Sequence, residues 1–529
     1  MKHMKDYLMT MAVSLLVCSC SFLDTAPEDF VSPEGYYKTA EQLESALLGV
    51  YAVMSTSPLY CNNMLGRMGL DADLGYEHYS TDKSGVGYYA ASPSDVKVTN
   101  YWKNLYNGID RANLLLENLD RPEMDETRRA QIRAEALFLR AYYHFLLVVR
   151  YGDVPLKLSA TRSAEKKELQ VPQSARRDVY LKIIADLEEA APVLPDAADV
   201  KYGERASKSA AYGILARVCL NMAGYPLYEE GMYSKAKQAA ETVISFGFHE
   251  LNPSYEDVFR KLIQDEYDIK ESIFEVGFWG TDTGTYTTVA GMVGRNNGIY
   301  FNNSTYSEVG ISIGCLRANE YYYNLFEPGD LRRDWTIADF QYESDGTISA
   351  TVPAVWERCC GKFRRTLELN TPKSKDKTST NFPILRYSDV LLMYAEAVAA
   401  DETNNNASDL AKAYEYVNQV RRRGFGQPIY TPNAAIDAVN EGKGALLDLV
   451  KDERARELGY ELTRKDDIVR WGEFYRRMQY LKGTVPAGST SYLESAREYY
   501  GGVQSRDFVW PIPSYEIGVN RSLVQNQGW

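Results

Sequence analysis

The stretch Leu385-Arg386-Tyr387-Ser388-Asp389-Val390-Leu391-Leu392-Met393-Tyr394-Ala395-Glu396-Ala397 leads into an apolar run that continues to Ala399. After a polar turn at residues 404–406, apolar residues return at spacings of three and four: Leu410, Ala413, Tyr414, Val417 and Val420. That spacing places them on one face of an amphipathic helix. Two helical segments around a short polar turn predict an antiparallel hairpin.

Two further hairpins are predicted in the N-terminal half. In the first, helical periodicity covers residues 102–119 and 132–146, with a break at residues 121–123. In the second, it covers residues 211–222 and 233–243, with glycine and proline between the two segments. Paired helices are therefore expected along much of the chain.

Local signals add detail to this scaffold. Thr39 and Gln42 have the spacing of a capping box, which predicts a helix beginning at about Ala40. Residues 178–190 form a further amphipathic segment. Small residues at the expected helix crossings make the hairpins resemble tetratricopeptide repeats. We expect a mainly α protein, with hairpins forming a superhelical scaffold, long irregular loops and minor β structure.

Two stretches interrupt the helical pattern, residues 62–100 and residues 278–345. Both are rich in glycine and aromatic residues, and long irregular segments in compact proteins usually carry function. The chain contains 41 tyrosines but only 17 phenylalanines. Aromatic rings that carry a hydroxyl suit surfaces that are both apolar and hydrated. This combination favours binding of a polar, ring-shaped ligand.

Composition argues against several other functions. The formal net charge of -13 makes nucleic acid a poor partner. Five cysteines follow Cys20 without a regular spacing, which is not a disulfide framework or a recognisable zinc site. With so few histidines as well, we expect no metal and no cofactor.

The N-terminus has the features of an export signal. Lys2 and Lys5 precede a short apolar segment that is too short to span a bilayer, and Ser19 lies directly before Cys20. This order resembles a bacterial lipobox, which predicts cleavage and lipidation at Cys20. The alternative is an ordinary cleaved signal with an accidental cysteine. No later segment has the length and apolarity of a membrane span.

Three C-terminal blocks resemble the SusD/RagB family of outer-membrane nutrient-binding lipoproteins. The first is the 385–397 stretch, and the second is Asp452-Glu453-Arg454-Ala455-Arg456-Glu457-Leu458 followed by Asp467-Ile468-Val469-Arg470-Trp471-Gly472. The third is the closing Trp510-Pro511-Ile512-Pro513 segment with the residues up to Trp529. The N-terminal half is also similar, so the resemblance covers nearly the whole mature chain.

The resemblance implies a SusD-like fold and a role in nutrient capture. Members are lipid-anchored on the cell surface of Bacteroidetes, in the outer membrane, and act with a SusC-like TonB-dependent transporter. Most capture an oligosaccharide or polysaccharide, and one branch captures peptides. The expected organisation is a signal peptide (1–19), a lipidated tether (20–38), an N-terminal helical region (39–260) and a C-terminal region (261–529) packed with it as one unit.

The two irregular stretches supply the candidate ligand-binding residues: Asp71, Asp73, Tyr76, Tyr79, Tyr88, Trp279, Tyr286, Arg295, Asn297, Tyr300 and Trp335. Aromatic rings stack on the apolar faces of sugars, and carboxylate, amide and guanidinium groups bind the hydroxyls. Trp279 is the preferred stacking residue because it lies in a loop. Trp335 could equally be a core residue. The asparagines could instead form turns.

Other interpretations remain open. A surface glycoside hydrolase could use Asp71 and Asp73, although neighbouring aspartates alone do not provide the required separation of two carboxyl groups. A pure interaction scaffold is a third possibility. The charged residues of the family blocks, Arg386, Glu453, Arg454, Glu457 and Arg470, are expected to form structural ion pairs and not a catalytic cluster.

Overall fold

The computed structural model describes residues 36–78, 83–163, 165–279, 290–306 and 308–529. Three of the expected functional residues, Cys20, Tyr79 and Tyr286, lie outside the described residues. The helices with more than ten residues are α2 (Ala40–Tyr51), α3 (Val96–Glu117), α4 (Glu126–Tyr151), α6 (Arg176–Ala190), α7 (Lys208–Ala223), α8 (Met232–Ser245), α13 (Tyr387–Ala400), α14 (Ala407–Gly424), α15 (Lys443–Leu458), α17 (Phe474–Thr484) and α18 (Ser491–Gly502).

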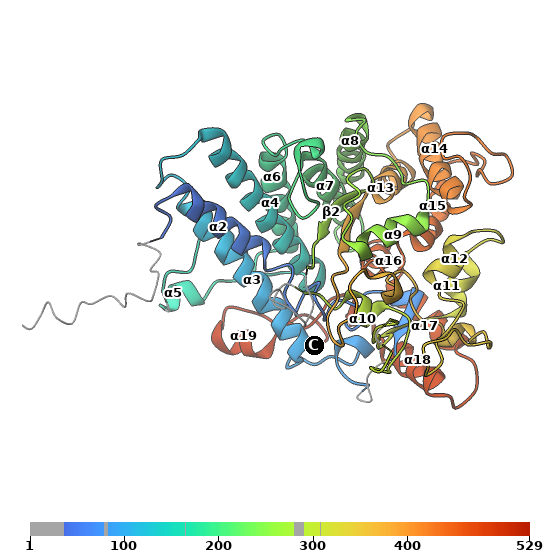
Figure 1. Ribbon diagram of the computed structural model, residues 1–529. Helices are drawn as coiled ribbons and strands as arrows, with labels where there is room; N and C mark the ends of the chain where they lie inside the picture. The colour runs from blue at the N-terminus through green and yellow to red at the C-terminus, as the bar shows by residue number, and fades with distance from the viewer. Residues whose placement is uncertain (1–35, 79–82, 164, 280–289, 307) are drawn as a thin grey trace, which may run out of the picture.

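Long helices pack side by side in a continuous series, as the sequence predicted. α3 packs on α4, α4 on α6, α6 on α7 and α7 on α8. The series then continues from α8 to α13, which contacts both α14 and α15. Figure 1 shows this array running from α2 and α4 at the left to α14 and α15 at the upper right. The three predicted hairpins correspond to α3–α4, α7–α8 and α13–α14.

Local capping explains where several helices begin. Thr39 and Gln42 form the predicted capping box at the start of α2. The Asp95 carboxylate accepts hydrogen bonds from two backbone N–H groups at the start of α3, and the Ser207 hydroxyl accepts one from the Ala210 N–H at the start of α7. These side chains satisfy N–H groups that have no partner within the helix. The positions of these helix starts are therefore encoded locally.

Between α8 and α13 the chain forms an insert of short elements, which lie in the right half of Figure 1, mostly below α13 and α14. The sequence predicted irregular structure over much of it, and the structure adds short helices and strands. These and the other short elements of the chain are β1 (Gly75–Glu77), α5 (Lys166–Leu169), α9 (Tyr255–Gln264), β2 (Ser272–Val276), α10 (Val293–Asn297), β3 (Leu316–Ala318), α11 (Glu320–Leu325), α12 (Arg332–Thr336), β4 (Phe382–Arg386), α16 (Arg464–Arg470) and α19 (Ser514–Val519).

Two small antiparallel sheets connect distant parts of the chain. β2 pairs with β4, which leads directly into α13. β1 pairs with β3, with Tyr76 opposite Arg317. Since β1 belongs to the first irregular stretch and β3 to the second, this sheet brings the two predicted loop regions together.

The charged residues of the family blocks form a buried ion-pair network. The Arg386 guanidinium contacts Glu457 at 2.8 Å and Glu271 at 2.7 Å. Arg454 binds Asp389 at 2.6 Å and Asp467 at 2.8 Å. These contacts join β4, α13, α15 and α16. The structural interpretation of these residues is confirmed, because all of the groups are buried and paired.

The C-terminal segment packs back onto the first hairpin. The Trp510 backbone N–H donates to the Arg150 carbonyl at 2.6 Å, and the Asn526 side chain donates to the Tyr151 carbonyl at 2.8 Å.

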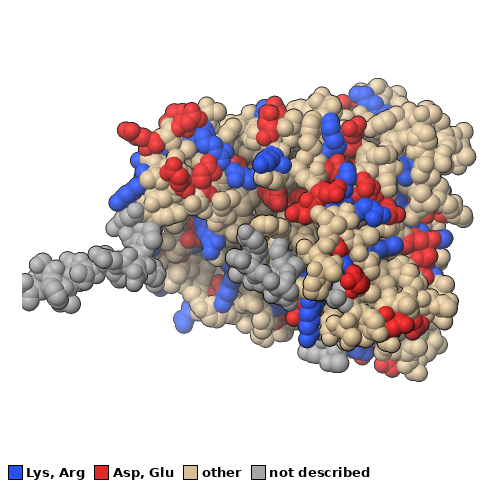
Figure 2. All heavy atoms as spheres, viewed as in Figure 1, with Lys and Arg blue, Asp and Glu red and all other residues tan. Residues whose placement is uncertain are grey.

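Among the described residues, none of the helices has the length and apolarity needed to span a membrane. Figure 2 shows acidic and basic side chains interspersed on the visible face, without a large area of one sign.

Candidate ligand-binding surface

The β1–β3 sheet supports an aromatic surface beside α18. The Arg317 guanidinium carbon lies 5.8 Å from the ring centre of Tyr300 and 5.2 Å from that of Tyr492. The His78 ring lies on Tyr492 with ring centres 4.4 Å apart and an angle of 35° between the planes. We call these four residues, His78, Tyr300, Arg317 and Tyr492, the aromatic platform. Tyr300 is 47% exposed, so the platform reaches the solvent.

Arg317 is the fixed centre of this arrangement. It is buried in β3, and its Nη1 donates to the Glu357 carbonyl at 2.7 Å and to Cys359 Sγ at 2.6 Å. The same sulfur accepts the Tyr300 backbone N–H at 3.2 Å. Cys359 therefore connects the cation to the backbone of the exposed tyrosine. A guanidinium held in this way is positioned before any ligand arrives, which lowers the ordering cost of binding.

His78 contributes a neutral ring. Its Nδ1 lies 2.9 Å from Ser495 Oγ, and its backbone N–H donates to the Cys315 carbonyl. Burial lowers the pKa of His78 to about 4, helped by the positive charges of Arg317 and Lys83. At neutral pH the ring is uncharged and can lie against Tyr492 without repelling the neighbouring guanidinium.

Sequence reasoning selected only Tyr300 from this platform. Arg317 lies in the second irregular stretch and His78 in the first, but neither position has a pattern that indicates a site. Tyr492 lies in α18, more than 400 residues from His78 along the chain. No local signal could have joined these residues, because the β1–β3 pairing and the packing of α18 on β1 bring them together.

Four predicted ligand-binding residues of the first irregular stretch are buried, which corrects the prediction for them. Asp71 is 1% exposed, and Asp73 is fully buried and binds Arg464 at 2.7 Å. The Tyr76 hydroxyl donates to the Trp356 carbonyl at 2.5 Å, and the Tyr88 hydroxyl donates to the Glu77 carbonyl at 2.9 Å. These four side chains are therefore covered by other parts of the protein.

The remaining candidates are spread over different environments. Trp279 is 56% exposed. Arg295 lies 3.3 Å from Asp376, and its side chain is mostly covered. Asn297 is completely buried in α10, so it is also corrected to a core residue. Trp335 is 8% exposed and lines a separate hollow between α9 and α12.

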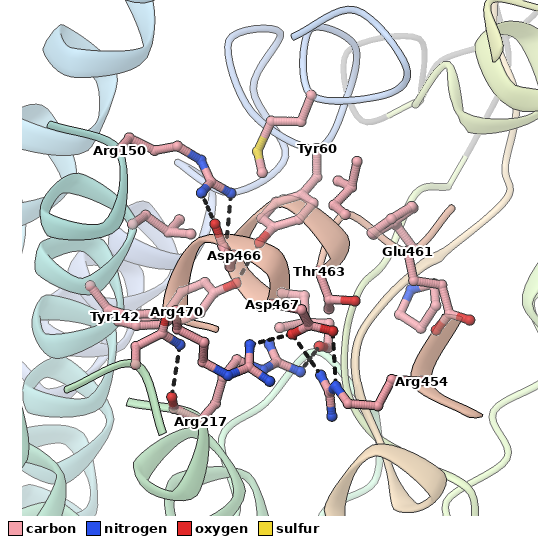
Figure 3. A pocket seen from close by; sticks show the side chains of 18 residues that line it. Tyr60, Tyr142, Arg150, Arg217, Arg454, Glu461, Thr463, Asp466, Asp467 and Arg470 are labelled. Carbon is pink, nitrogen blue, oxygen red and sulfur yellow. Dashed lines mark hydrogen bonds and ion pairs between the residues drawn. The ribbon is translucent and has the colours of Figure 1, made fainter. Parts of the chain in front are cut away.

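A second group of polar residues surrounds an internal cavity of about 30 Å³ (Figure 3). Asp467 accepts hydrogen bonds from Arg454 at 2.8 and 3.0 Å, and Asp466 pairs with Arg150. The volume is sufficient for about one water molecule. This cluster is therefore part of the structural ion-pair network and has no room for a sugar.

Metal binding has no support in the described part of the chain. Across residues 36–78, 83–163, 165–279, 290–306 and 308–529, no three histidine, cysteine, aspartate or glutamate side chains are grouped as metal ligands. The five cysteines after Cys20 are all buried and free.

The protein is a scaffold of helical hairpins that carries an aromatic surface built from distant segments of the chain. The chain belongs to the SusD/RagB family. The profile of a SusD-like family described as "Starch-binding associating with outer membrane" matches residues 21–220, and that of the SusD family matches residues 357–529.

Individual relatives extend the match over the whole chain. SusD-like protein P2 of Formosa agariphila is 26% identical over 99% of both chains. The starch-binding protein SusD of Bacteroides thetaiotaomicron is 24% identical over 83% of this chain and 80% of its own. A crystal structure of a SusD homologue from the same organism superposes with a TM-score of 0.85 and 27% identity, covering 96% of this chain and all of the other.

Proposed function

We propose that this protein is a cell-surface lipoprotein that binds an oligosaccharide or polysaccharide. The observation that carries the proposal is the aromatic platform, in which two tyrosine rings flank a fixed, buried guanidinium and the Tyr300 ring is exposed. Sugars present apolar ring faces, and the exposed ring of Tyr300 offers a π surface on which such a face can stack. The names of relatives support the same ligand class, since one is a starch-binding protein and a solved SusD-like structure is described as laminarin binding.

The proposal includes a location and a partner. Cys20 would carry the lipid, residues 20–38 would tether the helical body, and the protein would face the cell exterior at the outer membrane. The outer-membrane association in the family description supports this placement. A SusC-like TonB-dependent transporter would receive the captured glycan, which is the role that family membership suggests.

We infer binding without catalysis. The pair that a glycoside hydrolase could have used, Asp71 and Asp73, is buried, and Asp73 is held by Arg464 and Arg477. Two carboxyl groups that flank a scissile bond must reach the substrate. The geometry at these positions supports a core role instead.

Isothermal titration calorimetry with a panel of polysaccharides tests the proposal. We expect Tyr300→Ala and Tyr492→Ala each to weaken glycan binding by about fivefold, since each removes an aromatic contact worth on the order of 1 kcal/mol. Tyr430→Ala is the matched control, because Tyr430 is 61% exposed and follows α14, outside the platform. Glycan binding that is unchanged in both platform variants would contradict the proposed site. Binding of peptides but of no glycan would replace it with peptide capture.

A further inference from the structure

The hollow between α9 and α12 has the properties of a second binding site. Its volume is about 460 Å³, within the usual range for small-molecule sites. Trp335 and Arg364 form one wall, with the Arg364 guanidinium carbon 3.9 Å from the centre of the indole ring. Asp334, Asp339 and Glu256 also line the hollow.

Two buried N–H donors on the wall lack a partner among the residues that the structure describes. They are the indole Nε1 of Trp335 and Nε of Arg423. Trp335 is 8% exposed and Arg423 is 1% exposed, so both groups have lost most of their contact with bulk water. A buried donor without a hydrogen bond destabilises the fold. Both nitrogens are covered by protein atoms, so the groups open to a ligand are the more exposed ones of the lining, such as Asp339.

The charges in the hollow favour a neutral polyhydroxyl ligand. Three carboxylates and two guanidinium groups line it, so acceptors and donors are both present without a strong excess of one sign. Part of this charge is already paired, since Arg423 binds Glu457 and Asp334 binds Arg333. A hydroxyl group donates and accepts, which makes it the group that can satisfy both kinds of partner.

The hollow and the aromatic platform both include residues of the insert between α8 and α13. The Arg364 guanidinium carbon lies 5.4 Å from the Phe340 ring centre, Phe340 contacts Tyr342, and Tyr342 contacts Phe301. Phe301 is the direct neighbour of Tyr300 in the platform. Ring contacts therefore run from Arg364 to Phe301, the residue next to Tyr300 in the chain.

We propose that the hollow between α9 and α12 is a second sugar subsite, with Trp335, Arg364 and Asp339 as its binding residues. The inference rests on the proposed glycan-binding function and adds a separate point of contact. Occupying both sites would give long glycans a higher apparent affinity than short ones through effective concentration.

Fluorine NMR of the full chain with 5-fluorotryptophan tests the subsite directly. Trp335→Phe assigns the Trp335 resonance among the seven tryptophans. The methyl glycosides of glucose, galactose, mannose and xylose are titrated in turn. We expect at least one of them to shift the Trp335 resonance saturably. Asp339→Asn alters an exposed residue that lines the hollow. In this variant the glycoside concentration that gives half of the maximal shift should rise by about 3–10-fold.

Glu343→Gln is the matched control, because Glu343 is exposed on the same segment but does not line the hollow. A Trp335 resonance that no glycoside shifts would overturn the subsite. An equal change of the half-maximal glycoside concentration in the Asp339 and Glu343 variants would also overturn the subsite.

Repeating the titration in Tyr300→Ala separates this inference from the proposed function. A Trp335 response that persists in this variant supports an independent subsite, and its loss assigns the signal to the platform. If the wild-type protein binds long glycans while Trp335 never responds, the subsite fails and the proposed function stands. If no glycan binds and no glycoside shifts the Trp335 resonance, the subsite and the proposed function both fail.

Discussion

Asp71 is a buried carboxylate that has neither a hydrogen bond nor an ion pair among the described residues. Burial raises its pKa to about 7, against a weak opposing effect of Lys362. A carboxyl group whose pKa is higher in the folded state holds its proton more tightly there. Its contribution to stability therefore falls as pH rises from about 4 to 7.

Replacing Asp71 by asparagine should stabilise the protein more at pH 8 than at pH 5. Between these pH values the wild-type carboxyl group loses its proton in the folded state. The free energy of unfolding of the wild type falls by about 3 kcal/mol over the two pH units between pH 5 and the pKa of about 7. Urea unfolding at both pH values measures the difference. Asp73→Asn is the contrasting variant, and it should destabilise at both because it leaves Arg464 and Arg477 without their carboxylate. A pH-independent effect of Asp71→Asn would show that Asp71 is already ionised in the fold.

At the scale of elements, buried ion pairs determine how the C-terminal helices pack. Glu457 of α15 lies within 2.5 Å of Arg423 in α14 and 2.8 Å of Arg386 at the end of β4. Burial opposes its ionisation, but Arg423, Arg386 and Arg332 together hold the pKa of Glu457 well below its ordinary value. A single carboxylate thus joins three segments that are far apart in sequence.

Glu457→Gln should destabilise the protein by about 3–5 kcal/mol, because it leaves several buried guanidinium groups without their shared counter-charge. The matched control is Glu189→Gln, whose pair with Arg133 is about half exposed. Glu189→Gln should lower the free energy of unfolding by less than about 1 kcal/mol. Chemical unfolding monitored by circular dichroism measures both. Equal stability of the two variants would show that the buried network contributes nothing specific.

At the scale of the whole molecule, the scaffold and the site have different origins. The long helices form a regular array, while the platform lies where the insert between α8 and α13 meets β1 and α18. The scaffold thereby holds two loop regions against each other. The proposed attachment at Cys20 would leave this whole body free to present the platform away from the membrane.

Lipid attachment is tested on the whole protein in its native host. Cys20→Ser should abolish incorporation of an alkyne-labelled fatty acid and move the protein out of the membrane fraction, since one residue would carry the anchor. Cys18→Ser changes the neighbouring cysteine of the same segment and should keep the label. Labelling that survives in Cys20→Ser would place the lipid elsewhere.

Much of the fold was predictable because its signals are local. Helical periodicity identified α3, α4, α7, α8, α13 and α14, and the Thr39 capping box identified the start of α2. The charged family blocks were correctly interpreted as structural. The candidate site was less predictable, since burial of Asp71, Tyr76 and Asn297 leaves no trace in a loop-like composition.

The sequence by itself determined that this is a mainly helical protein of the SusD/RagB family, because periodicity, caps and family blocks are properties of neighbouring residues. Only the tertiary structure decided which aromatic residues face the solvent. Tyr76 in β1 is covered by β3 and α18, whereas Tyr492 in α18 lies beside Arg317 and His78. The physical reason is that exposure depends on which distant segments pack together, and this cannot be read from the residues of one loop.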